Sequence, residues 1–174
     1  MMRQIGLAAG AVALVLAGSA HAQRGVSNVS AGLEPSQEVP AVSSPARGSF
    51  EARIDDVAQM VEYTLTYEGL QADVRMSHIH IAQKNVNGGI MVWLCGTATN
   101  PGPAGTQVCP QSGTVTGVIT PSDVGAVTTQ GIAPGEFGEF VAAIRAGLAY
   151  VNVHTAQSPG GEIRGQLGPG SGHH

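Results

Sequence analysis

Three histidines in the interior of the chain have types and spacings that could hold a metal ion. His78 and His80 are two residues apart, and His154 follows in a later segment. Imidazole nitrogen binds copper, zinc, nickel and iron, and a set of three histidines leaves a coordination position open. We expect one mononuclear site. Copper is the first choice because the affinity order of divalent ions peaks there, and zinc is the alternative.

The residues around these histidines alternate as in β-strands. Isoleucines alternate with His78 and His80 in residues 76–81, and valines alternate with His154 in residues 150–155. Successive side chains of a strand point to opposite faces of its sheet, so the aliphatic residues would face the core. The imidazoles would then lie on the solvent side. A surface site made of three histidines is therefore expected if the two strands are neighbours.

Met76 shares the expected face with His78 and His80. Its thioether could supply a soft fourth ligand, although methionine in such a position more often serves packing. The alternative interpretation of the whole set is that the histidines are polar residues on the wet face of a sheet, with no ion between them.

The N-terminal residues 1–22 have the pattern of a secretory signal peptide. A single charge at Arg3 precedes an apolar run over residues 5–20, and Ala20-His21-Ala22 gives a small-x-small cleavage signature. The run is short for a membrane anchor, the alternative interpretation. Cleavage after Ala22 would release a periplasmic or secreted protein, and no later segment is apolar and long enough to span a bilayer.

Composition excludes some classes of partner and activity. The formal net charge is −4 and charged residues make up 11% of the chain, so no basic patch is available to neutralise nucleic-acid phosphates. A Gly-x-Ser-x-Gly elbow and a Ser-His-Asp signature are missing from the sequence, which argues against a hydrolase. The expected partners are a metal ion and another extracytoplasmic protein.

The two cysteines, Cys95 and Cys109, are expected to form a disulfide because exported proteins mature in oxidising surroundings. The alternative is a pair of thiolate metal ligands, but their spacing is far from the C-x-x-C pattern of such sites.

Short β-branched runs separated by 25 glycines and 10 prolines predict an all-β fold. The expected strands cover residues 48–54, 60–67, 76–81, 89–94, 113–119, 148–154 and 162–167. Two short helical segments, starting at Thr120-Pro121 and running from Phe137 to Ile144, would be inserted between them. The polar start of the mature chain is expected to be mobile. We predict one antiparallel β-sandwich domain over residues 23–167, followed by a flexible tail, residues 168–174, with His173 and His174.

Four motifs resemble the chordin (CHRD) domain family. They are Gln-Glu-Val-Pro at residues 37–40, Ser-His-Ile-His at residues 77–80, and the segments 150–156 and 159–167. The resemblance covers nearly all of the mature chain, and the loop from Cys95 to Cys109 departs from it. It implies an immunoglobulin-like, Greek-key β-sandwich in an extracellular or periplasmic setting, without a settled activity. In animal chordin such domains belong to a growth-factor antagonist.

A looser similarity is to copper-zinc superoxide dismutase, in which a His-x-His strand and a later Val-His strand hold copper. By that similarity His78, His80 and His154 match copper ligands and Arg164 matches the arginine that guides the anion. The bridging histidine and the zinc-loop cluster of that enzyme are missing here. As plain structure, Arg164 would pair with Glu162 or another surface carboxylate.

These observations give three functional hypotheses. The first is an exported CHRD-domain protein that binds one copper ion, in copper binding or handling, and is not an enzyme. The second is a metal-free module for protein–protein interaction. The third is a copper-only oxidoreductase of the superoxide dismutase type.

Overall fold

The computed structural model describes residues 25–170 of the chain. The expected signal peptide, residues 1–22, and the terminal pair His173 and His174 lie outside the described residues. Within residues 25–170 no helix has the length and apolar character that crossing a membrane requires.

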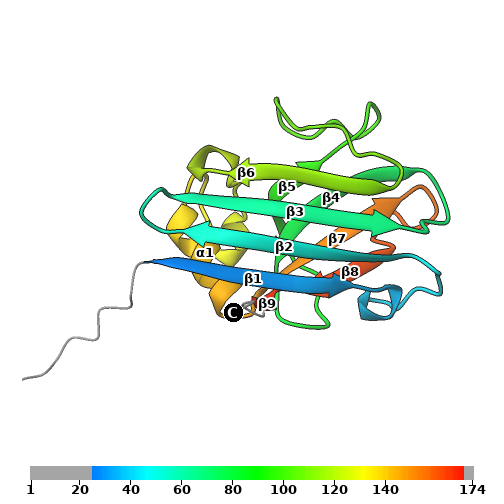
Figure 1. The fold of residues 1–174 in the computed structure, drawn as a ribbon, viewed down its shortest axis with the longest axis horizontal. Helices are drawn as coiled ribbons and strands as arrows, with labels where there is room; N and C mark the ends of the chain where they lie inside the picture. Colours follow the sequence, from blue (N-terminus) through cyan, green and yellow to red (C-terminus); the bar gives the residue numbers. More distant parts are fainter. Residues whose placement is uncertain (1–24, 171–174) are drawn as a thin grey trace, which may run out of the picture.

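Two antiparallel sheets pack face to face (Figure 1). One has the strand order β6-β3-β2-β1-β9 and the other the order β5-β4-β7-β8. The first sheet contains β1 (Val26–Leu33), β2 (Arg47–Asp55), β3 (Met60–Glu68), β6 (Gly113–Ile119) and β9 (Gly168–Pro169). The second contains β4 (Val74–Ile81), β5 (Gly89–Cys95), β7 (Ala149–Thr155) and β8 (Ile163–Gln166). The predicted all-β sandwich is confirmed.

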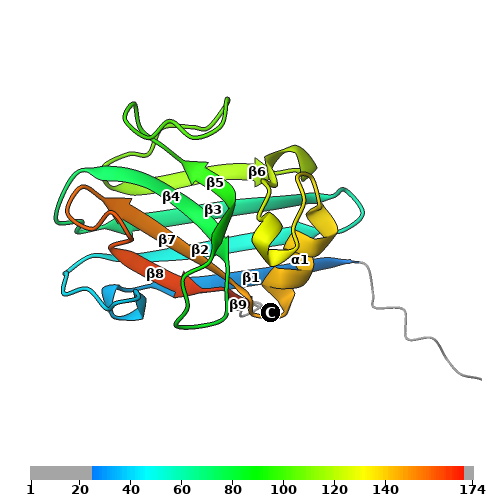
Figure 2. The same ribbon diagram turned by 180° about the vertical axis from the view of Figure 1, so that it is seen from behind.

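The chain crosses between the sheets several times. β3 and β6 are neighbours in the first sheet, although β4 and β5, which separate them in sequence, belong to the second. Such a return after an intervening hairpin is a Greek-key connection. Figure 2 shows the second sheet from its outer side, with β4 and β7 side by side at its centre. This adjacency decides where the histidines lie.

The core fills the space between the sheets. In β2 and β3 buried and exposed residues alternate, because one face of each strand meets the core and the other meets solvent. Phe50 and Leu65, partners in the β2–β3 register, are both buried, and Ile79 and Val151 of the second sheet belong to the same hydrophobic core. Burial of such side chains contributes about 1.5–3 kcal/mol each.

All seven strands predicted from the sequence are present, with bounds that differ by two residues or fewer. The expectation of a mobile start was wrong: β1 is an ordered strand that pairs with β2 along its whole length. Only three of its eight residues are polar, and only Val29 and Leu33 are buried, so the usual alternation is weak. Gly168 and Pro169, expected to begin the flexible tail, pair with Ser30 and Val29 as β9.

Both predicted helical segments are present. A 3₁₀ turn, η2 (Pro121–Asp123), follows Thr120, whose backbone N–H donates to the Asp123 side chain at 2.8 Å. The helix α1 (Phe137–Arg145) buries Phe140 and Ile144 against one end of the sandwich (Figure 2). Two further 3₁₀ turns are η1 (Pro35–Gln37) and η3 (Thr128–Gln130).

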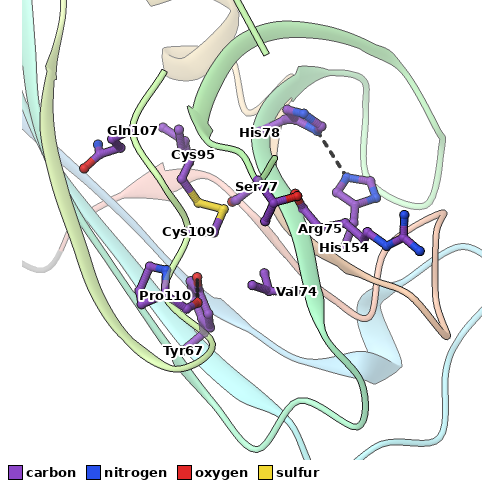
Figure 3. The surroundings of a disulfide bond; sticks show 12 residues. Tyr67, Val74, Arg75, Ser77, His78, Cys95, Gln107, Cys109, Pro110 and His154 are labelled. Carbon is purple, nitrogen blue, oxygen red and sulfur yellow. Dashed lines mark hydrogen bonds between the residues drawn. A yellow bond between two sulfur atoms is a disulfide. The ribbon is translucent and has the colours of Figure 1, made fainter. Parts of the chain in front are cut away.

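The predicted disulfide between Cys95 and Cys109 is confirmed (Figure 3). It closes the loop that leaves the end of β5, and Gly96 supports it by exchanging backbone hydrogen bonds with Gln107 and Cys109. The Tyr67 hydroxyl donates to the Pro110 carbonyl at 2.6 Å, which ties the loop to β3. A closed loop of this length contributes about 3 kcal/mol by restricting the unfolded chain.

Candidate metal centre

The three internal histidines meet on one face of the second sheet. β4 and β7 are antiparallel neighbours, and their register puts His78 opposite Asn152 and Met76 opposite His154. Partners in an antiparallel pair point to the same face. One ring nitrogen from each of His78, His80 and His154 can be chosen so that all three lie within 4.8 Å of one another. The condition that the sequence left open, adjacency of the two strands, is therefore met.

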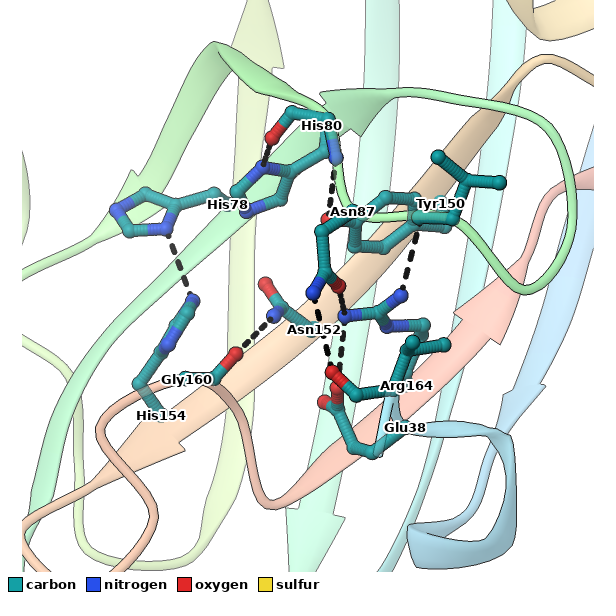
Figure 4. Close-up of polar contacts among 12 residues, drawn as sticks. Glu38, His78, His80, Asn87, Tyr150, Asn152, His154, Gly160 and Arg164 are labelled. Atoms are coloured by element: carbon teal, nitrogen blue, oxygen red, sulfur yellow. Dashed lines mark hydrogen bonds and ion pairs between the residues drawn. The ribbon is translucent and has the colours of Figure 1, made fainter. Parts of the chain in front are cut away.

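The expectation that these histidines lie at the surface was wrong. His78 is fully buried, and His80 and His154 are only 7% and 5% exposed. Loops cover this face of the sheet, as Figure 4 shows. The carbonyl of Gly88, between β4 and β5, contacts His80, and the carbonyl of Pro159, between β7 and β8, contacts His154. These loops have no apolar periodicity, so their position over this face of the sheet could not be predicted from the sequence.

The two carbonyl contacts fix the protonation of two rings. Nδ1 of His80 lies 3.0 Å from the Gly88 oxygen, and Nδ1 of His154 lies 2.9 Å from the Pro159 oxygen. A carbonyl only accepts hydrogen bonds, so each Nδ1 carries the proton and donates. The Nε2 atoms of both rings then keep a free lone pair. Such backbone contacts are the usual support of metal-binding histidines.

His78 completes the group from the other side. Its Nδ1 lies 3.2 Å from Nε2 of His154 (Figure 4). Because Nε2 of His154 bears a lone pair, two arrangements satisfy this contact: Nδ1–H of His78 donates to it, or both lone pairs face a shared cation. Nε2 of His78 and Nε2 of His80 are buried without a hydrogen-bond partner.

All three imidazoles are held in the neutral form that binds metals. Burial, followed by repulsion from His154 and His80, lowers the pKa of His78 to about 2. Burial likewise lowers the pKa of His80 and of His154 to about 4, although the contacts with Gly88 and Pro159 act in the opposite direction. Near neutral pH no proton needs to be displaced before an ion binds.

Aromatic side chains pack against two of the three imidazole rings. The indole of Trp93 lies edge-on to His78, with ring centroids 4.1 Å apart. The phenol ring of Tyr150 stacks on His80 at 4.7 Å with an interplanar angle of 2°. These contacts restrict ring rotation, so the cluster is organised before any ligand arrives.

Arg164 does not have either of its expected surroundings. Its side chain is 4% exposed and pairs with Glu38 at 2.9 Å rather than with Glu162. It also donates to the Asn87 side chain at 2.6 Å and lies 4.1 Å from the centre of the Tyr150 ring. A buried guanidinium neutralised by a carboxylate lacks the exposure that an anion guide needs.

Glu162 is satisfied by other donors. The hydroxyls of Ser44 and Thr155 donate to its two carboxylate oxygens at 2.6 and 2.7 Å, and the Gln71 backbone N–H donates at 2.9 Å. This carboxylate therefore ties two loops to the start of β8 and has a structural role.

Five buried side-chain atoms in the described part of the chain have no hydrogen-bond partner, and all belong to this face. They are Oε1 of Glu38, Nε2 of His78, Nε2 of His80, Oδ1 of Asn152 and Nε of Arg164. Buried polar atoms are nearly always paired in native proteins, so unpaired ones in one place indicate room for a polar guest. The Nε2 atom of His80, whose lone pair is free because its Nδ1 donates to Gly88, fits a metal ion.

The sequence did not identify the residues that surround the histidines. Met76 was singled out, and it is half-buried on the expected face. Tyr150 was not, although it alternates with the same valines as Asn152 and His154 and so shares their face. Glu38 had a weak signal, since it lies in the Gln-Glu-Val-Pro motif. Trp93 gave none.

The sequence model of the CHRD domain matches residues 29–167. No curated protein and no solved structure matches the chain. CHRD domains are extracellular, and the Cys95–Cys109 disulfide fits such a setting. The match includes β2 to β8, the larger part of β1 and all three internal histidines, and by this match the chain belongs to the CHRD domain family.

Proposed function

We propose that this protein is exported and binds a single copper ion through His78, His80 and His154, in copper binding or handling. The observation that carries the proposal is the convergence of three neutral, buried imidazoles from two strands, with candidate ligand atoms within 4.8 Å. Carbonyls and aromatic rings already orient these imidazoles, so binding requires little reorganisation.

The donor set argues against a structural zinc site, which is almost always closed by four protein ligands, usually with thiolates. Three histidines with an open position also suit a catalytic zinc ion, so the choice of copper over zinc rests on affinity. Within residues 25–170 the group consists of histidines only, and both cysteines are in the disulfide. Among divalent ions, copper binds nitrogen ligands most tightly.

Export is the second part of the proposal. It rests on the signal-peptide pattern of residues 1–22, and the disulfide supports an oxidising compartment. The mass of the protein recovered from the periplasm or medium should correspond to a chain that begins at Gln23. Recovery of the full-length chain in the cytoplasm would contradict this part.

Metal analysis after purification without an affinity tag tests the site. We expect one copper ion per chain in the unchanged protein and none in the variant with His78, His80 and His154 replaced by alanine. A second variant, with His173→Ala and His174→Ala, is the matched control because it removes histidines outside the cluster. It should keep its copper.

Loss of copper counts only if the altered protein is folded. The far-ultraviolet circular dichroism of the triple variant should match that of the parent, and the single variant His80→Gln serves if the triple variant does not fold. Copper content that is unchanged in a folded variant would reject the site.

Protein binding is the second candidate function. The disulfide-closed loop projects from the sandwich (Figure 1) and leaves Val108 77% exposed. A protein that carries no metal after copper loading would support this candidate. A superoxide dismutase activity is less well supported, because the histidines are buried and Glu38 neutralises Arg164. Superoxide turnover by the copper-loaded protein would restore it.

A further inference from the structure

We propose that the three-histidine centre is selective for monovalent copper, Cu(I), over Cu(II). This inference rests on the proposed function, and it adds the oxidation state of the ion. Its basis is the absence of negative charge from the ligand group within residues 25–170, combined with burial of the group.

The first argument is the charge left in the buried site. The three imidazoles are neutral, and the Glu38–Arg164 pair beside them carries no net charge. A bound Cu(I) therefore leaves one positive charge on this face, and Cu(II) leaves two. In the Born description the cost of removing an ion from water rises with the square of its charge, so it is about fourfold larger for the divalent ion.

Arg164 adds to this preference. Its guanidinium lies 4.1 Å from the centre of the Tyr150 ring, and that ring stacks on His80 at 4.7 Å, so a positive charge lies one aromatic ring away from the histidines. The repulsion between this charge and a bound ion is twice as large for a divalent cation as for a monovalent one.

Coordination geometry is the second argument. Cu(II) prefers a square-planar or tetragonal set of nitrogen and oxygen ligands. The described residues supply three imidazoles and no carboxylate to the ligand group, and all three imidazoles are buried. Three nitrogen ligands without added water suit the lower coordination number of Cu(I).

The softness of the surroundings is the third argument. Met76 lies opposite His154 in the register and shares the face of the sheet with the histidines. Thioethers favour Cu(I) over Cu(II). Selective binding of Cu(I) would raise the reduction potential of the bound copper by about 59 mV for each tenfold difference in affinity between the two oxidation states.

Two competition titrations on the mature protein test the inference. Under anaerobic conditions bicinchoninate competes for Cu(I), and in air glycine competes for Cu(II). We expect the dissociation constant for Cu(I) to be about a hundredfold lower or more. Equal affinities, or tighter binding of Cu(II), would overturn the inference while leaving a copper protein. Binding of neither ion would overturn the proposed function itself.

A pair of charge variants tests the physical cause. Glu38→Gln leaves Arg164 unpaired and should increase the preference for Cu(I) about tenfold, whereas Arg164→Gln leaves the carboxylate and should decrease it about tenfold. Circular dichroism identifies a variant that has unfolded, and the remaining one then decides. Preferences identical to that of the parent in a folded variant would refute the charge argument.

Discussion

The outer faces of the two sheets differ in their exposure to solvent. On the five-stranded sheet, Arg53 pairs with Glu62 at 3.3 Å, with side chains 45% and 53% exposed. On the four-stranded sheet, Arg164 pairs with Glu38 at 2.9 Å, with side chains 4% and 2% exposed. The same chemical pair is therefore solvated on one face and enclosed by loops on the other.

This difference shows which face of the molecule is not built for stability alone. β7 is buried at all seven positions, so both of its faces are covered, whereas β2 and β3 are covered on one face only. The second cover consists of polar groups, and buried ion pairs often stabilise a protein less than apolar residues of the same volume would. Buried polar groups that are retained although they lower stability indicate a functional site.

Acidification should destabilise the enclosed face most. In chelator-treated protein, the pKa of His80 and of His154 is about 4, against about 6.5 in the unfolded chain. Above pH 6.5 the rings are neutral in both states. Between pH 6.5 and 4 only the unfolded chain takes up protons, so the free energy of unfolding falls as the pH falls, by up to about 1.4 kcal/mol per pH unit for each histidine.

Urea unfolding between pH 4 and pH 7 measures this slope. The variant with all three histidines replaced by asparagine is the control, because it keeps Glu38 and the carboxylates of the exposed face. Parallel pH profiles for the two proteins would show that the histidines are not held neutral in the native state.

The two Arg–Glu pairs give the most direct mutational comparison. Arg164→Ala leaves the buried carboxylate of Glu38 without its partner and should lower the free energy of unfolding by about 3–5 kcal/mol. Arg53→Ala breaks a solvated pair and should cost about 0–1 kcal/mol. Urea denaturation of both variants measures the difference, and equal losses would contradict the contrast between the faces.

Copper should stabilise the protein through the enclosed face alone. A ligand that binds only the native state adds about 2.7 kcal/mol to the free energy of unfolding when its free concentration is a hundred times its dissociation constant. Differential scanning fluorimetry with and without Cu(I) under anaerobic conditions should show a higher melting temperature for the unchanged protein. The same increase in the triple histidine variant would place the binding elsewhere.

The turn after β7 offers the finest comparison. A Cβ atom on Gly161, whose φ is 130°, would collide with the carboxylate of Glu38, whereas one on Gly160 would meet no atom within 4 Å. Gly161→Ala should therefore cost about 1–3 kcal/mol, and Gly160→Ala should cost far less. Thermal denaturation of both variants measures this. Equal melting temperatures of the two variants would show that the turn at Gly161 is not tightly packed against the Glu38–Arg164 pair.

The sequence could predict the strands because alternation is a local property. Residues 60–67, for example, predict a half-buried strand whatever the neighbouring strands are, and the structure confirms this. β1 escaped detection because Val29 and Leu33 are its only fully buried residues and stand four positions apart. Its order comes from pairing with β2 over eight positions, which is a long-range property.

The ligand candidates could be predicted, but their enclosure could not. The face shared by His78 and His80 follows from a spacing of two residues, and His154 follows from the same reasoning once β4 and β7 are neighbours. Burial of these rings depends on the Gly88 and Pro159 loops, which fold back over the sheet. The partnership of Glu38 with Arg164 joins residues distant in sequence, and no pattern in the sequence connects them.

A crystal structure of the copper-loaded protein, with anomalous diffraction recorded at the copper absorption edge, tests the central claim most directly. Copper bound by three imidazoles on the enclosed face predicts one strong anomalous peak within bonding distance, about 2.0–2.1 Å, of ring nitrogens of His78, His80 and His154. A peak at the terminal histidines, or no peak between these three rings, would contradict the claim.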